Sequence, residues 1–118
     1  MIYVGLDRGA KNANLHWYLA ITEDGTMFKH EDKDTLKEVL EYVEEMQKEA
    51  AKDVVICFDH WGASSQIVEM AEFVSEHKGI RLELTKIGGD RLSKLKAEQV
   101  AVNAIQKVIE KATTPAEQ

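Results

Sequence analysis

Three aspartates stand at the ends of β-rich runs, and they are the residues of this sequence best suited to chemistry. Asp7 and Asp59 directly follow apolar runs, and Asp90 follows two glycines after an alternating run. Two or three carboxylates at one edge of a sheet would hold Mg²⁺ or Mn²⁺, hard cations that prefer oxygen ligands. Such ions activate water and stabilise the leaving oxygen in phosphodiester cleavage. A structural interpretation is also open, in which Asp7 and Asp59 hydrogen-bond turns and Asp90 caps a helix.

The elements that must position these aspartates are predicted by hydrophobic spacing. Period-two alternation and short apolar runs indicate strands, whereas apolar residues three and four apart indicate helices. Residues 8–14 have the composition of a turn, Asp24-Gly25 indicates a hairpin, and Thr35 is correctly spaced from Glu38 for a capping box. The predicted strands cover residues 2–6, 15–21, 26–29, 53–58 and 81–87, and the predicted helices begin at Asp34 or Thr35, at Ser64 or Ser65, and at Asp90.

The order of these elements, β-β-β-α-β-α-β-α, predicts an α/β fold. Right-handed crossovers would bring the fourth and fifth strands parallel to the first, giving a mixed five-stranded sheet with helices on both faces. Ligands of such sheets collect beyond the carboxyl ends of the parallel strands. We therefore expect Asp7 and Asp59 to meet there, with Asp90 near the start of the last helix.

Length and composition restrict the classes of protein that the chain can belong to. With 118 residues, 44% of them hydrophobic, and a net charge of −6, we expect one domain over residues 1–112 and a flexible tail over 113–118. No apolar run approaches the roughly 18–20 residues that a membrane helix needs. A signal-peptide pattern is absent and Cys57 is the only cysteine, so we expect a cytoplasmic protein without an internal disulfide. Neither a GxGxxG fingerprint nor a Walker A motif is present.

Two short motifs resemble those of known families. The segment Gly5-Leu6-Asp7-Arg8-Gly9, followed by a strand and an acidic glycine turn, resembles the opening of RuvC-like resolvases and of their YqgF relatives. Asp90-Arg91-Leu92-Ser93 resembles a segment of YqgF proteins, here without its glutamate. Actin-like ATPases open in a comparable way. The order of elements is that of the three-layer ribonuclease H-like fold.

This resemblance assigns roles to the acidic residues. Asp7 matches the first catalytic acid of ribonuclease H-like nucleases, and Asp59 stands where their fourth-strand acid stands. The last acid of the family lies on the final helix, where this sequence has Asn103 and Gln106 as amides. Glu98 and Glu110 are the acids that remain on that helix. The acidic set is therefore incomplete, with Asp7 and Asp59 as metal ligands and Asp90 or Glu98 as a possible third.

Basic and aromatic residues near the same edge suggest contacts with nucleic acid. A local basic patch can neutralise phosphates whatever the net charge, and an aromatic ring can stack on a base. His60 could orient a water molecule at this edge. Scattered surface charges, with Trp61 as a lid over the core, are the alternative interpretation. The candidate nucleic-acid-binding residues are Arg8, Lys11, Trp61, Lys86, Arg91 and Lys94.

Three functions remain open from the sequence. The first is a metal-dependent nuclease or resolvase-like protein that acts on nucleic acid with Mg²⁺ or Mn²⁺. The second is a non-catalytic ribonuclease H-like module that binds nucleic acid or a protein partner. The third, a relative of the actin-like ATPases, is disfavoured because those proteins enclose a nucleotide between two such domains. The apolar residues Val102, Ile105, Val108 and Ile109 of the last helix additionally predict a homodimer.

Overall fold

The computed structural model describes residues 1–11, 14–60, 64–86 and 97–113, which form five strands and three helices. Asp90 and the candidate nucleic-acid contacts Trp61, Arg91 and Lys94 lie outside the described residues. In chain order the elements are β1 (Ile2–Lys11), β2 (Asn14–Thr22), β3 (Lys29–Lys33), α1 (Leu36–Ala50), β4 (Val54–His60), α2 (Ser64–Ser75), β5 (Ile80–Lys86) and α3 (Ala97–Thr113).

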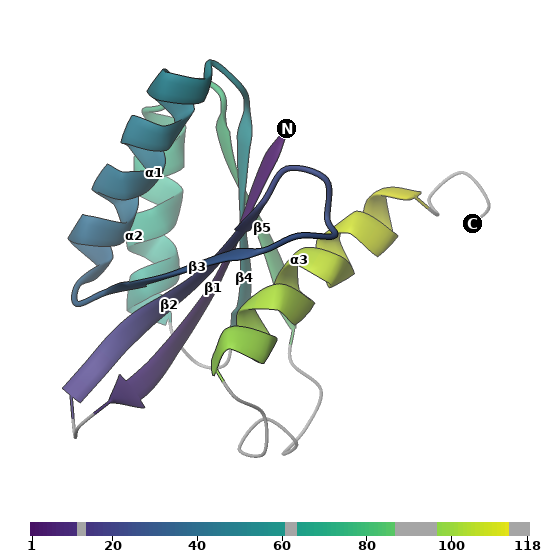
Figure 1. The fold of residues 1–118 in the computed structure, drawn as a ribbon. Coiled ribbons are helices and arrows are strands. Elements are labelled where there is room, and N and C mark those ends of the chain that lie inside the picture. The colour runs from purple at the N-terminus through teal and green to yellow at the C-terminus, as the bar shows by residue number, and fades with distance from the viewer. Residues whose placement is uncertain (12–13, 61–63, 87–96, 114–118) are drawn as a thin grey trace.

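The strands form one mixed sheet in the order β3-β2-β1-β4-β5. β1 pairs antiparallel with β2 and parallel with β4, and β5 extends the parallel half. Helices α1 and α2 cover one face of the sheet and α3 crosses the other (Figure 1). The predicted α/β architecture, a mixed five-stranded sheet between helices, is confirmed.

Each face of the sheet has its own core. On the α1/α2 face, Val4 and Leu6 of β1 pack with Val39 and Met70, all of them buried. The core under α3 is built largely from small side chains, which lets the helix approach the sheet closely. It comprises Ala20, Val55, Cys57, Ala101, Ala104, Ile105 and Val108.

The core under α3 also contains Cys57 and two of the residues that predicted a homodimer. Burial, assisted by the charge of Glu83, raises the pKa of the Cys57 thiol to about 12, so this cysteine is an uncharged core residue. Ile105 and Val108, two of the α3 residues that predicted a homodimer, pack against the sheet of their own chain. The homodimer stays a prediction.

None of the helices in the described ranges has both the length and the apolar character that a membrane crossing requires.

The first strands are longer than predicted, and this places the aspartates inside strands. β1 continues through the expected turn to Lys11 because it pairs with β2 as far as Lys11 opposite Asn14. Asp7 therefore lies within β1, opposite Tyr18, and not after it. Asp59 likewise lies within β4, opposite Thr85. Backbone pairing across the hairpin outweighs the weak strand preference of the glycine-containing segment.

The hairpin and the first helix show how local polar contacts set element boundaries. Asp24 Oδ1 accepts hydrogen bonds from the N–H groups of Thr26 and Met27, at 2.9 and 3.4 Å. This loop takes the place of the predicted strand over residues 26–29, so β3 begins only at Lys29. The predicted helix cap is confirmed, since Thr35 accepts a hydrogen bond from the Glu38 N–H at 3.2 Å.

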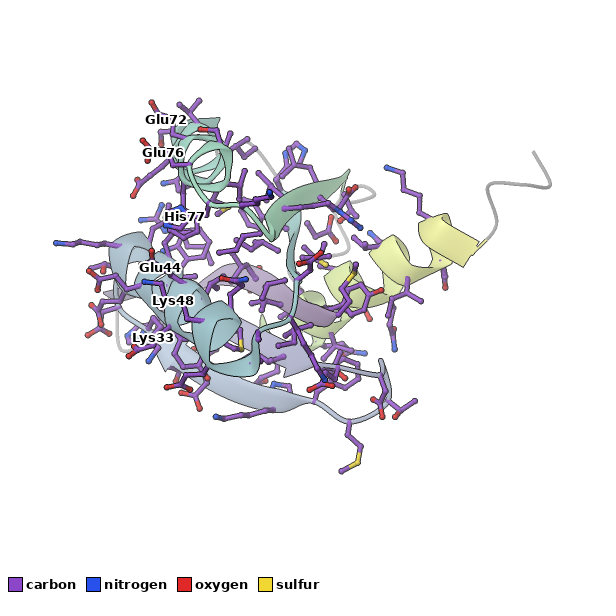
Figure 2. All side chains as sticks on the ribbon, turned by 90° about the horizontal axis from the view of Figure 1, so that it is seen from above. Lys33, Glu44, Lys48, Glu72, Glu76 and His77 are labelled. Carbon is purple, nitrogen blue, oxygen red and sulfur yellow. The ribbon has the colours of Figure 1, made fainter. Side chains whose placement is uncertain are left out.

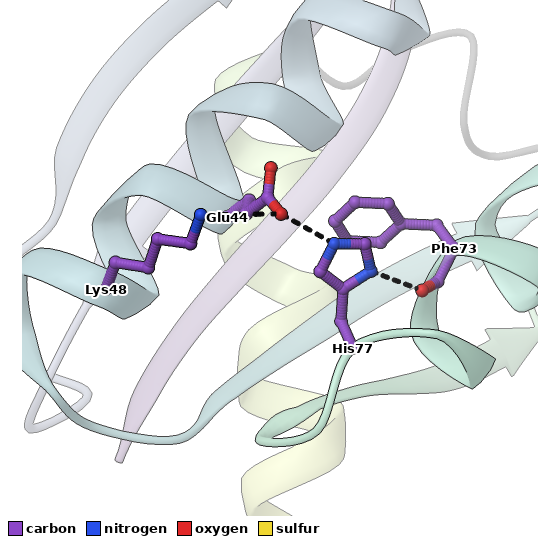
Figure 3. Close-up of polar contacts among 4 residues, drawn as sticks. All are labelled: Glu44, Lys48, Phe73 and His77. Carbon is purple, nitrogen blue, oxygen red and sulfur yellow. Dashed lines mark hydrogen bonds and ion pairs between the residues drawn. The ribbon is translucent and has the colours of Figure 1, made fainter.

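His77 ties the end of α2 to α1 (Figure 3). Its Nε2–H donates to Glu44 Oε2 and its Nδ1–H donates to the Phe73 carbonyl oxygen, each over 2.7 Å. The ring also stacks on Phe73, with 4.0 Å between centroids. Lys48 Nζ is 3.8 Å from the same Glu44 oxygen. Seen from above, His77 lies between Glu76 and Glu44 (Figure 2), so both helices present acceptors or charge that favour its cation.

We expect the His77 contacts to make stability depend on pH. The Phe73 carbonyl and then the Glu44 carboxylate raise the pKa of His77 above its ordinary value, against the effect of burial. A raised pKa stabilises the fold fully below the unfolded value, and that contribution is lost as pH rises through the folded value. His77→Gln should therefore lower the free energy of unfolding more at about pH 5.5 than at about pH 8.5, as measured by urea denaturation. The same substitution at exposed His30 is the control, and an equal loss for His77→Gln at both pH values would contradict the expectation.

Candidate active site

A row of polar side chains crosses the α3 face of the sheet. Tyr18 pairs with Asp7 on one side and with Asp32 on the other, and Asp59 pairs with Thr85. Leu6 is opposite Phe58 in the parallel pair, so Asp7 and Asp59 occupy the next position on each strand. Paired residues of neighbouring strands share a face, and Asp7 shares that of Gly5, which lies directly under α3. The structure thus brings Asp7 and Asp59 together, as predicted.

Asp59 is a buried carboxylate with one oxygen in use and one without a partner. The residue is 4% exposed, and Lys107 Nζ of α3 lies 3.1 Å from its Oδ2. Its Oδ1 is buried and accepts no hydrogen bond from the residues that the structure describes, and among these residues the buried Thr85 hydroxyl likewise has no partner. A buried polar atom without a partner costs free energy, so such groups point to a ligand or a water molecule at the same place.

Asp7 is partly buried and electrostatically coupled to Asp59. Burial and then the Asp59 charge raise the pKa of Asp7 to about 6, whereas a hydrogen bond from the Arg8 N–H opposes the rise. Two carboxylates that repel each other in this way would both be stabilised by a cation between them. The donor set therefore suits a divalent cation, with oxygen ligands from Asp7 and Asp59 and an unused oxygen on Asp59.

The third acid is a weaker part of the prediction. Glu98 lies exposed in the first turn of α3, beside a small cleft that is lined by Tyr18, His30 and Asp32 among others. Across the described ranges, no three His, Cys, Asp or Glu side chains form a group suited to a metal ion. Within the described ranges Glu98 is thus not grouped with Asp7 and Asp59, and its role as a third ligand stays a prediction.

Among the predicted basic residues, Arg8 has a side chain in the described part of the chain, and that side chain lies away from the aspartates. The Arg8 guanidinium lies over the Trp17 ring, 5.7 Å from its centroid, on the α1/α2 face. Arg8 thus points away from the face of Asp7, because side chains alternate along a strand. His60 packs near Phe58 on that same opposite face, with 6.5 Å between ring centroids. Lys11 and Lys86 end β1 and β5, and their side chains lie outside the described residues.

Lys107 and Thr85 are the site residues that sequence reasoning missed. Thr85 stands opposite Asp59 in the parallel pair of β4 and β5, a register that no local pattern in the sequence shows. Lys107 flanks the apolar stripe of Ala104 and Val108, so helical periodicity places it beside the sheet-facing side of α3. The carboxylate that it pairs with cannot be identified from that periodicity.

The fold resembles that of a solved structure, the resolvase of Fowlpox virus in a complex with its substrate Holliday junction DNA. The TM-score is 0.55 at 14% sequence identity, and the match covers 96% of this chain and 99% of that one. No protein-family model matches the sequence, and no curated protein matches it significantly. At this level of identity the likeness concerns architecture, and it agrees with the order of strands and helices described above. The chain has a ribonuclease H-like fold.

Proposed function

We propose that this protein binds nucleic acid and hydrolyses phosphodiester bonds with a Mg²⁺ or Mn²⁺ ion held by Asp7 and Asp59. The observation that carries the proposal is the buried Asp59 carboxylate, whose Oδ1 has no partner among the described residues and which lies beside Asp7 on the next strand. The likeness to a resolvase solved with Holliday junction DNA supports nucleic acid as the substrate class and makes branched DNA the first substrate to test.

Asp59, Asp7 and Thr85 would have different roles at this site. When bound, the cation would act as a Lewis acid toward a phosphate oxygen and lower the pKa of a bound water. Asp59, buried and held by Lys107, serves as the rigid ligand. Asp7 is only partly buried, so a polymeric substrate could reach its carboxylate. Thr85 adds a hydroxyl next to Asp59 that can orient a water molecule.

The experiment is a cleavage assay with Mn²⁺ or Mg²⁺ on a labelled four-way DNA junction, a linear duplex and a single strand. Asp7→Asn and Asp59→Asn should each lower cleavage by more than about 100-fold, since changing even a group that only supports a metal ligand costs about 10- to 100-fold. Asp53→Asn, the same change at an exposed position before β4, should leave cleavage unchanged. Cleavage that persists in Asp7→Asn, or none on any substrate with either ion, contradicts the proposal.

A specific observation also favours the second candidate, a non-catalytic module that binds nucleic acid. Lys107 already neutralises one of the two carboxylates, and no third ligand joins them within the described part of the chain. The two functions differ in how binding responds to the metal. Junction binding that needs no divalent cation, survives Asp7→Asn and is accompanied by no cleavage would establish the module in place of the nuclease.

A further inference from the structure

We propose that the site holds one divalent cation and not two, because Lys107 supplies the second positive charge from α3. The inference rests on the proposed function, in that it concerns the cation of the same Asp7–Asp59 site. It assigns to Lys107 a positioning role that sets the number of ions and acts through Asp59.

The two carboxylate oxygens of Asp59 differ in their contacts. Lys107 Nζ lies 3.1 Å from Oδ2, whereas Oδ1 has no partner in the described part of the chain. A carboxylate that joins two metal ions offers one oxygen to each of them. Here the ammonium already occupies the second oxygen, so one oxygen of Asp59 remains for a divalent ion.

Burial keeps Lys107 in this place. The Asp59 side chain is 3% exposed, and removing the partner of a buried carboxylate leaves a charge that water cannot solvate. The Lys107 side chain is 43% exposed, so its ammonium keeps part of its hydration while it holds Asp59. A second ion that displaced Lys107 would therefore break an ion pair in which the buried carboxylate is neutralised and the ammonium stays partly hydrated.

Charge balance leads to the same number of ions. Asp7 and Asp59 carry two negative charges, and Lys107 brings the cluster to −1. One divalent ion then gives +1, whereas two ions would give +3 in a partly buried site with no third acid among the described residues. Lys107 thus contributes a fixed positive charge to the site from α3, because its ammonium is part of the chain.

The experiment counts Mn²⁺ ions per chain by calorimetric titration and reports metal–metal coupling by electron paramagnetic resonance. Wild type and Lys107→Arg should bind one ion without coupling. Lys107→Met should bind the first ion at least about tenfold more tightly, because a repelling charge is gone. Lys107→Glu provides three carboxylates and should bind two coupled ions. Lys111→Glu makes the same charge change one turn farther along α3, at an exposed position, and should behave as wild type.

The outcomes separate this inference from the proposed function. Two ions bound to wild type, or a first ion that binds no more tightly to Lys107→Met, would overturn the one-ion site while leaving a metal-dependent enzyme intact. No Mn²⁺ bound to wild type or to any variant would overturn both. Thermal unfolding followed by circular dichroism identifies any variant that is not folded. If Lys107→Glu or Lys107→Met does not fold, the number of ions bound to wild type and to Lys107→Arg, which keeps the positive charge, still tests the one-ion site.

Discussion

Replacing Gly5 with alanine is expected to lower the free energy of unfolding by about 3 kcal/mol, the upper end of the usual cost of overpacking a core. A Cβ atom at this position would stand 2.0 Å from the carbonyl oxygen of Ala101 and 3.0 Å from Ile105 Cγ1. The first of these contacts is with helix backbone, which cannot rotate away as a flexible side chain can. Relief would require α3 to move off the sheet.

Urea denaturation of Gly5→Ala measures this cost, and Gly79→Ala is the informative comparison. Gly79 has a φ of 91°, which disfavours alanine, but its Cβ would meet the flexible Gln47 amide at 3.0 Å. The expected penalty at Gly79 is about 1 kcal/mol, from backbone conformation alone. If Gly5→Ala costs no more than Gly79→Ala, close packing of α3 is not the reason for glycine in β1.

The glycine of β1 also bears on the site. α3 approaches the sheet because Gly5, Ala20, Ala101 and Ala104 offer so little volume between them. The same approach brings Lys107 to Asp59. Three consecutive residues of β1 thus have three different roles. Gly5 leaves room for α3, Leu6 packs in the core on the opposite face, and the Asp7 carboxylate lies on the face that α3 covers.

The parts of the fold that the sequence predicts correctly are those determined by local spacing. Leu36, Val39 and Val43 recur at helical intervals, so the first helix and its buried side could be assigned. The order of elements then left few topologies, because parallel crossovers are right-handed. Thr35 could be identified as a cap because its partner lies only three residues away.

The parts that the sequence could not predict depend on pairing between distant residues. The extension of β1 to Lys11 comes from hydrogen bonds with β2, and it turns Arg8 to the face opposite Asp7. Lys107 and Asp59 are 48 positions apart, and nothing local marks either one as a partner of the other. The two aspartates themselves were found because strand order alone brings them together.

Replacing Asp7 with asparagine is expected to stabilise the protein at neutral pH and above, while it removes a proposed metal ligand. Burial and repulsion from Asp59 raise the pKa of Asp7 to about 6 from an unfolded value of 3.8. The neutral carboxyl is thus favoured in the folded state, and this stabilisation is full below the unfolded pKa and lost as pH rises through about 6. Asparagine, which does not ionise, should unfold with a free energy on the order of 2 kcal/mol higher at alkaline pH.

The pH dependence of the difference between the two proteins identifies the cause. The stability of Asp7→Asn relative to wild type should be near zero at about pH 4 and rise to its plateau above about pH 7, which the exposed control Asp53→Asn should not reproduce. A difference that is constant with pH would mean that the two side chains differ in packing or hydrogen bonding and not in charge. Saturating Mn²⁺ should narrow the gap by stabilising wild type alone, since a ligand that binds only the folded state raises its stability. If Asp7 is present for cation binding, Asp7→Asn should stabilise the metal-free protein, and Mn²⁺ should reduce that gain. If Asp7 only hydrogen-bonded a turn, the same substitution should destabilise the protein.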